Sequence, residues 1–118
     1  MDTEYQLGKG NIYVLVRFTE PKTVEILLGE KGGDMLKFTP SLWYEFLKFR
    51  YGRSTLLKKS LMVASEGDEM KLQTTDGSTC LLERGELDFL LELDDEIMHD
   101  IALLYMERIF YDLLLEKL

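Results

Sequence analysis

The chain has 118 residues, of which 46% are hydrophobic and 31% charged, and its formal net charge is −8. This composition excludes a disordered chain and predicts one globular domain over residues 1–118. The sequence has no run of about 18 to 20 apolar residues, so no membrane span is predicted. A single cysteine, Cys80, and an acidic start without an apolar run indicate an intracellular protein without internal disulfides.

The first half of the chain predicts strands that lead into a helix. Three strands are expected, over residues 11–18, 23–28 and 35–38. Turns at 19–22 and 30–34 separate them. Thr39 is suited to cap a helix that begins at Pro40, carries a broad apolar stripe and ends near Gly52.

The second half repeats this order less clearly. Strands are expected over residues 56–64, 70–74 and 79–83, and Asp76 with Gly77 is a strong hairpin signal between the last two. From residue 86 to 118 there is no Gly or Pro, and apolar residues recur at spacings of three and four, which predicts a long amphipathic helix. A break near Asp94 or Asp95, either of which could cap a second helix, is an alternative.

A shift of 44 residues superposes the apolar positions of the two halves. The matching pairs are Ile26 with Met70, Leu28 with Leu72, Leu36 with Cys80, Phe38 with Leu82, Trp43 with Leu87, Phe46 with Leu90, Leu47 with Leu91 and Phe49 with Leu93. Such self-similarity suggests a duplicated unit, over residues 1–52 and 53–118. The alternative is that any junction between a strand and a helix alternates apolar residues in this way.

The charge is distributed unevenly between the halves. Residues 1–60 contain ten Lys or Arg against seven Asp or Glu, a net of +3, whereas residues 61–118 contain four against fifteen, a net of −11. An acidic protein is not an obvious binder of nucleic acid, because phosphate contacts supply much of that affinity. A polarised one could bind through its basic half, while the acidic half keeps it in solution.

The first fifty residues carry a recognisable pattern. It consists of residues 13–17 (YVLVR), Lys22, the strand around Ile26, a glycine-containing loop, and then Leu36, Phe38, Pro40, Trp43, Leu47 and Lys48. This pattern resembles the positive-cofactor-four family of transcriptional coactivators, which bind single-stranded DNA. The same half is similar to a repeat of the Pur family, and Pur and Whirly proteins repeat a unit of four strands and a helix within one chain.

The resemblance implies an α+β fold of two strand-rich units, each followed by a helix, with the second helix long and C-terminal. In the coactivator family, basic and aromatic residues on the strands and the first hairpin turn contact unpaired nucleic acid. Here Lys22 matches a family lysine, but Thr19 and Glu20 stand where the family pattern favours an aromatic residue and a lysine, and Leu28 lies near a position where it carries arginine.

Binders of single strands need cations along a groove and aromatic faces on which bases stack. Tyr13, Leu15 and Arg17 share one face of the first predicted strand, and the opposite face is apolar. The candidate nucleic-acid-binding residues are Tyr13, Arg17, Lys22, Lys31, Lys37, Lys58 and Lys59. The alternative is that Tyr13 and Arg17 are ordinary surface residues of a sheet. Trp43 is expected in the core.

The C-terminal helix has more apolar surface than one covered face requires. The candidates for a homodimer or partner interface are Ile101, Leu104, Tyr105, Ile109, Phe110 and Leu113. The alternative is that the helix packs across its own sheet. One histidine, His99, and one cysteine exclude a Cys/His zinc set, and no phosphate-binding glycine loop is present, so we expect no enzyme, metal or cofactor.

Two functions follow as hypotheses. The first is a protein that binds single-stranded DNA or RNA on a curved sheet, as a transcription or replication cofactor, nuclear in a eukaryotic or virus-infected cell and in contact with the transcription machinery. The second is an acidic protein-interaction module of the same fold that recruits a basic partner. Convergence of Tyr13, Arg17, Lys22 and Lys37 on one exposed face favours the first. Interleaving of Glu20, Glu25 and Glu30 with them favours the second.

Overall fold

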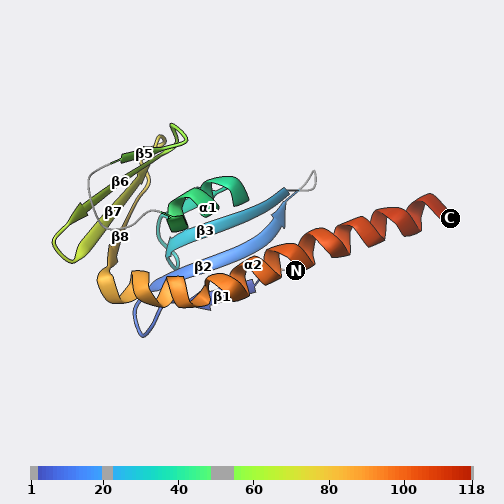
Figure 1. Ribbon diagram of the computed structural model, residues 1–118, viewed down its shortest axis with the longest axis horizontal. Coiled ribbons are helices and arrows are strands. Elements are labelled where there is room, and N and C mark those ends of the chain that lie inside the picture. The colour runs from blue at the N-terminus through green and yellow to red at the C-terminus, as the bar shows by residue number, and fades with distance from the viewer. Residues whose placement is uncertain (1–2, 20–22, 49–54, 118) are drawn as a thin grey trace.

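The computed structural model describes residues 3–19, 23–48 and 55–117. It has two four-stranded antiparallel sheets, each followed in the chain by a helix (Figure 1), which confirms the predicted α+β class. Strand order within each sheet follows the chain, so every neighbouring pair is a hairpin.

The first sheet contains β1 (Thr3–Gln6), β2 (Ile12–Thr19), β3 (Thr23–Glu30) and β4 (Met35–Phe38), and α1 (Pro40–Lys48) follows it. The Thr39 hydroxyl accepts a hydrogen bond from the Leu42 amide at 3.1 Å, as predicted for the helix cap. Strand β1 was not expected, because its four residues (TEYQ) are mostly polar. Thr19, the first residue of the turn predicted at 19–22, belongs to β2, while the rest of that turn and the predicted helix end at Gly52 lie outside the described residues.

The second sheet contains β5 (Thr55–Leu57), β6 (Leu61–Glu66), β7 (Glu69–Thr74) and β8 (Thr79–Glu83). The expectation of one strand over residues 56–64 is therefore wrong. Lys58 and Lys59 both have positive φ (48° and 58°), and the Ser60 amide donates to the Leu57 carbonyl at 2.9 Å. These contacts close a tight turn that reverses the chain between β5 and β6.

Helix α2 (Arg84–Lys117) is one continuous helix of 34 residues, so the alternative of a break near Asp94 or Asp95 is wrong. Buried Leu90 and Ile97 lie on either side of Asp94, and only an unbroken helix keeps both on the same side. The helix starts with the Glu83 amide donating to the Glu86 carboxylate at 3.0 Å, which resembles a capping box.

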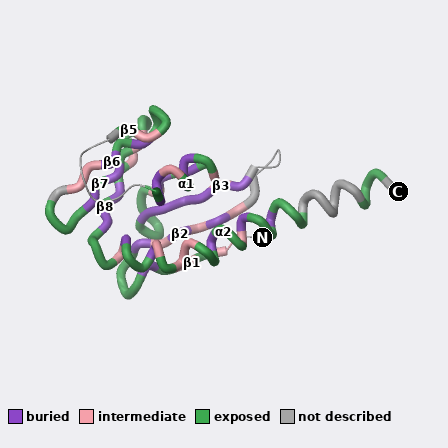
Figure 2. The backbone as a smooth tube through the Cα atoms, in the orientation of Figure 1, coloured by how far each residue is buried: buried purple, intermediate pink, exposed green. Residues whose placement is uncertain are grey.

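Both units contribute to one apolar core, and both helices pack on it. Helix α1 contacts β3, β4 and β5, while α2 contacts β8 and crosses to β2 and β3 of the first sheet. Trp43 is fully buried, as expected, and meets the Phe38 ring edge-on at 5.0 Å between centroids. In the described part of the chain, buried residues from both sheets and both helices form this core, and the burial colours of Figure 2 follow them along the backbone.

The strand register of the two sheets repeats with the 44-residue shift seen in the sequence. In the first sheet the core pairs between β3 and β4 are Ile26 with Phe38 and Leu28 with Leu36. In the second sheet the core pairs between β7 and β8 are Met70 with Leu82 and Leu72 with Cys80. The sequence repeat therefore coincides with matching hairpins.

Candidate nucleic-acid interface

The candidate interface is the side of the first sheet that faces away from α1 and α2. Alternation along β2 places Val14 and Val16 in the core, while Tyr13, Leu15 and Arg17 point to the other side and are half-buried. We call this side the outer face. By strand register its side chains are Glu4, Gln6, Tyr13, Leu15, Arg17, Glu25, Leu27, Met35 and Lys37.

One cation of the outer face is paired along the sheet. Arg17 and Glu25 are direct cross-strand partners in the β2–β3 hairpin. The Arg17 Nη2 and Nε atoms both donate to Glu25 Oε1, at 2.7 and 3.0 Å. A guanidinium held in this way is fixed in position, and its charge is largely compensated.

A second cation lies above an aromatic ring. Lys31, in the turn after β3, places its Nζ 5.1 Å from the centroid of the Tyr13 ring. The same Nζ donates to Glu4 Oε1 at 2.9 Å, and this hydrogen bond is the main reason that the pKa of Lys31 is raised. Tyr13, Lys31 and Glu4 thus form one group near the end of the sheet where β2 begins and β3 ends.

The remaining candidate residues fall into three places. Lys37 is exposed on β4, opposite Leu27 and on the same outer face as Tyr13 and Arg17. Lys58 and Lys59 are exposed in the β5–β6 turn of the second sheet, so the structure does not bring them onto the outer face. Lys22 lies outside the described residues.

The candidate dimer residues also divide. Ile101 and Leu104 are buried in the chain's own core, as in the alternative of packing across the sheet, and are therefore not part of an exposed surface. Tyr105 is 37% exposed. The side chains of Ile109, Phe110 and Leu113 lie outside the described part of the structure.

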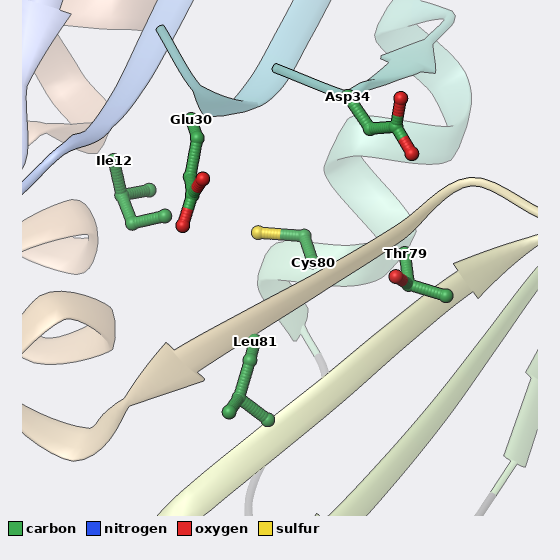
Figure 3. A pocket seen from close by; sticks show the side chains of 6 residues that line it. All are labelled: Ile12, Glu30, Asp34, Thr79, Cys80 and Leu81. Atoms are coloured by element: carbon green, nitrogen blue, oxygen red, sulfur yellow. The ribbon is translucent and has the colours of Figure 1, made fainter.

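A cavity of about 330 Å³ lies between the two units and is lined by Ile12, Glu30, Asp34, Thr79, Cys80 and Leu81. The Cys80 thiol and the Glu30 carboxylate face each other across it (Figure 3). Burial, with smaller contributions from Glu86 and Glu30, raises the pKa of the thiol to about 12. The thiol is therefore protonated at neutral pH and unsuited to nucleophilic chemistry. Two carboxylates also make this cavity unfavourable for phosphate.

Sequence reasoning missed Glu4, because it missed the strand that carries it. Glu25 was recognised as a residue that could interleave with the cations, but its bond to Arg17 depends on the β2–β3 register. Alternation along β2 predicts that Arg17 points outward, but it does not identify which residue of β3 lies opposite Arg17.

Comparisons with protein families, curated proteins and solved structures find no match to this chain. Within the described residues, no three His, Cys, Asp or Glu side chains form a group that could hold a metal ion. No helix in the same part of the chain is long and apolar enough to span a membrane.

Proposed function

We propose that this protein binds single-stranded DNA or RNA on the outer face of its first sheet, as a cofactor of transcription or replication. The observation that carries the proposal is the position of Tyr13. Its ring lies beneath Lys31, on the same outer face as Arg17 and Lys37. An aromatic surface among cations is the combination that unpaired bases and their phosphates require.

The arrangement of the chain supports a related proposal about the fold. We infer that the two units are copies of one unit of four strands and a helix, as in Pur and Whirly proteins. The matching hairpins and the identical strand order of the two sheets support this inference. Similarity of fold alone does not assign an activity, so the function is argued from the outer face.

Binding requires an exchange of ionic partners. In the free protein, Glu25 and Glu4 satisfy Arg17 and Lys31. Phosphates of a bound strand replace these carboxylates as acceptors, and a base stacks on Tyr13. The two glutamates thereby compete with the phosphates and lower the affinity of the protein for nucleic acid. They also disfavour the binding of other anions, which cannot stack on Tyr13.

The proposal predicts distinct effects for Tyr13 and Lys31. We expect Tyr13→Leu to weaken single-strand binding by roughly tenfold, because stacking contributes about 1–3 kcal/mol per base. Lys31→Gln should reduce the slope of log affinity against log salt by about 0.7, as expected for one lost phosphate contact. Fluorescence anisotropy with a labelled oligonucleotide measures both.

Helix α1 offers matched controls. Lys48 Nζ lies 4.8 Å from the Tyr44 ring centroid, and Tyr44 is 54% exposed, so this pair repeats the same chemistry away from the outer face. Tyr44→Leu and Lys48→Gln should leave binding unchanged. Equal losses in both pairs of variants would locate binding elsewhere or show it to be unspecific.

The ion pairs also favour a second candidate, an acidic interaction module that recruits a basic protein. Two cations of the candidate interface are neutralised by glutamates, and residues 84–118 contain ten Asp or Glu. Glu25→Gln separates the two functions. It should strengthen nucleic-acid binding by freeing Arg17, whereas a module that recruits a basic protein would show no nucleic-acid affinity to strengthen.

A further inference from the structure

Gly29 occupies a place in the first sheet where both neighbouring strands carry large side chains. By register it lies opposite Tyr13 of β2 and opposite Met35 of β4. Alternation along β3 gives it the same direction as Glu25 and Leu27, so a side chain at this position would point to the outer face. Glycine weakens the interior of a strand, and where it occurs another backbone often approaches closely. The structure shows such an approach on the outer side of Gly29.

The backbone at the end of the β3–β4 turn fills the space that a side chain at position 29 would need. A Cβ atom on Gly29 would overlap the Asp34 carbonyl oxygen and would lie 2.9 Å from the Met35 Cα. Both are backbone atoms, so no change of side-chain rotamer could relieve the overlap. The φ of Gly29 is not positive, so space and not backbone conformation requires glycine here. Because Gly29 lacks a Cβ, the turn can lie directly against β3.

The same turn carries Lys31 and is tied to its surroundings by two backbone hydrogen bonds. The Lys31 amide donates to the Asn11 carbonyl at 3.2 Å, and the Gly33 amide donates to the Glu30 carbonyl at 3.0 Å. The side chain of Lys31 then reaches the Tyr13 ring, with 5.1 Å between Nζ and the ring centroid. A short turn held at these points transmits a shift of its last residue to the others. The space beside β3 therefore affects where Lys31 lies.

We propose that Gly29 positions Lys31 over Tyr13, by leaving the room that the β3–β4 turn needs. Its effect on binding rests on the proposed function. A cation already held beside the stacking surface meets phosphate with less loss of side-chain freedom, and preorganisation of this kind raises affinity. The position of Lys31 is independent of nucleic acid, however, and can be measured in the free protein. The positioning role and the proposed function can thus fail separately.

Two signals of the free protein report the position of Lys31. The protons on its Cε atom should be shifted upfield by the Tyr13 ring, and its pKa is raised mainly by the hydrogen bond to Glu4. Gly29→Ala should displace the turn, so the upfield shift should disappear and the pKa of Lys31 should fall toward its ordinary value. Nuclear magnetic resonance with labelled lysine side chains measures both.

Gly33→Ala is the matched control, because Gly33 lies in the same turn. A Cβ atom there would meet the Glu30 Cβ at 3.5 Å, an ordinary contact, and the φ of Gly33 is not positive. Gly33→Ala should therefore keep both Lys31 signals. The proposal is wrong if both variants change these signals equally, or if Gly29→Ala leaves them unchanged. It is also wrong if Gly29→Ala loses the circular dichroism spectrum of the folded protein, because the glycine would then serve the whole fold.

Binding separates the positioning role from the proposed function. With a labelled oligonucleotide, Gly29→Ala should reduce the slope of log affinity against log salt by about 0.7, as expected for Lys31→Gln, since each removes one phosphate contact. The double variant should lose no more than either single variant, whereas additive losses would overturn the proposal. If Lys31 moves as expected but the unsubstituted protein binds no oligonucleotide, the positioning role stands and the proposed function fails.

Discussion

Asp94 lies in the buried row of α2, between Leu90 and Ile97. Its Oδ1 atom is buried without a hydrogen-bond partner among the described residues. Burial first, and the neighbouring Asp95 second, raise the pKa of this carboxyl. The folded protein therefore holds the Asp94 proton more tightly than the unfolded chain. The resulting stabilisation is present below the unfolded pKa of about 3.9 and is lost as the pH rises through the folded value.

Replacing Asp94 should therefore stabilise the protein at neutral pH. We expect Asp94→Asn to raise the free energy of unfolding at pH 7, with the gain disappearing near pH 3.5, and Asp94→Leu to add about 1 kcal/mol by burying apolar surface. Urea unfolding at both pH values measures this. Glu96→Gln, an exposed charge on the same helix, is the control. A lower stability for both Asp94 variants at pH 7 would show that the carboxylate has a partner it needs.

At the scale of elements, the β5–β6 turn is where the residue types fit their backbone conformation least well. Lys58 and Lys59 both occupy the left-handed region, which costs a residue with a side chain about 1–2 kcal/mol. Lysine is not a turn signal, and this explains why residues 56–64 were expected to form one strand. The turn around Asp76 and Gly77 was predicted correctly, because Gly77 takes a positive φ (92°) and the Asp76 carboxylate accepts from the Ser78 amide at 3.0 Å.

Substituting the turn with favoured residues should stabilise the second sheet. Lys58→Asn together with Lys59→Gly is expected to raise the free energy of unfolding by about 1–2 kcal/mol. Lys71→Gln, which removes a charge from a strand of the same sheet, should have little effect. Because these two lysines lie away from the outer face, oligonucleotide affinity should fall only slightly. A large loss of affinity with normal folding would move the binding site to this turn.

At the scale of the whole molecule, the pattern of hydrophobic residues predicted more of the fold than the distribution of charged residues did. Residues that alternate or recur at helical spacing identified β2, β3, β4, β7, β8 and both helices, because burial imposes those periods. The same patterns aligned the two hairpins whose register repeats. They did not identify β1, whose pairing with β2 is set by tertiary contacts and not by its own residues.

The candidate site was predictable only in part, because the sequence shows which residues of a strand share a face but not which residues lie beside them in the folded sheet. Alternation along β2 placed Tyr13 and Arg17 on one face, and the structure agrees. Whether a cation is available to phosphate depends on its neighbours in the folded sheet, and here Glu25 pairs with Arg17 and Glu4 pairs with Lys31. The molecule is elongated, 57 × 31 × 26 Å, because α2 extends past the core, and local pattern does not reveal where a helix loses its partners.

The most direct test of the central claim is a titration of a labelled single-stranded oligonucleotide with the purified protein, repeated across salt concentrations beside a duplex of the same sequence. The outer face provides two to three cations, so the account predicts preference for the single strand and a slope of log affinity against log salt of about −1.5 to −2. Absence of binding at low salt, or equal binding of the duplex, would contradict it.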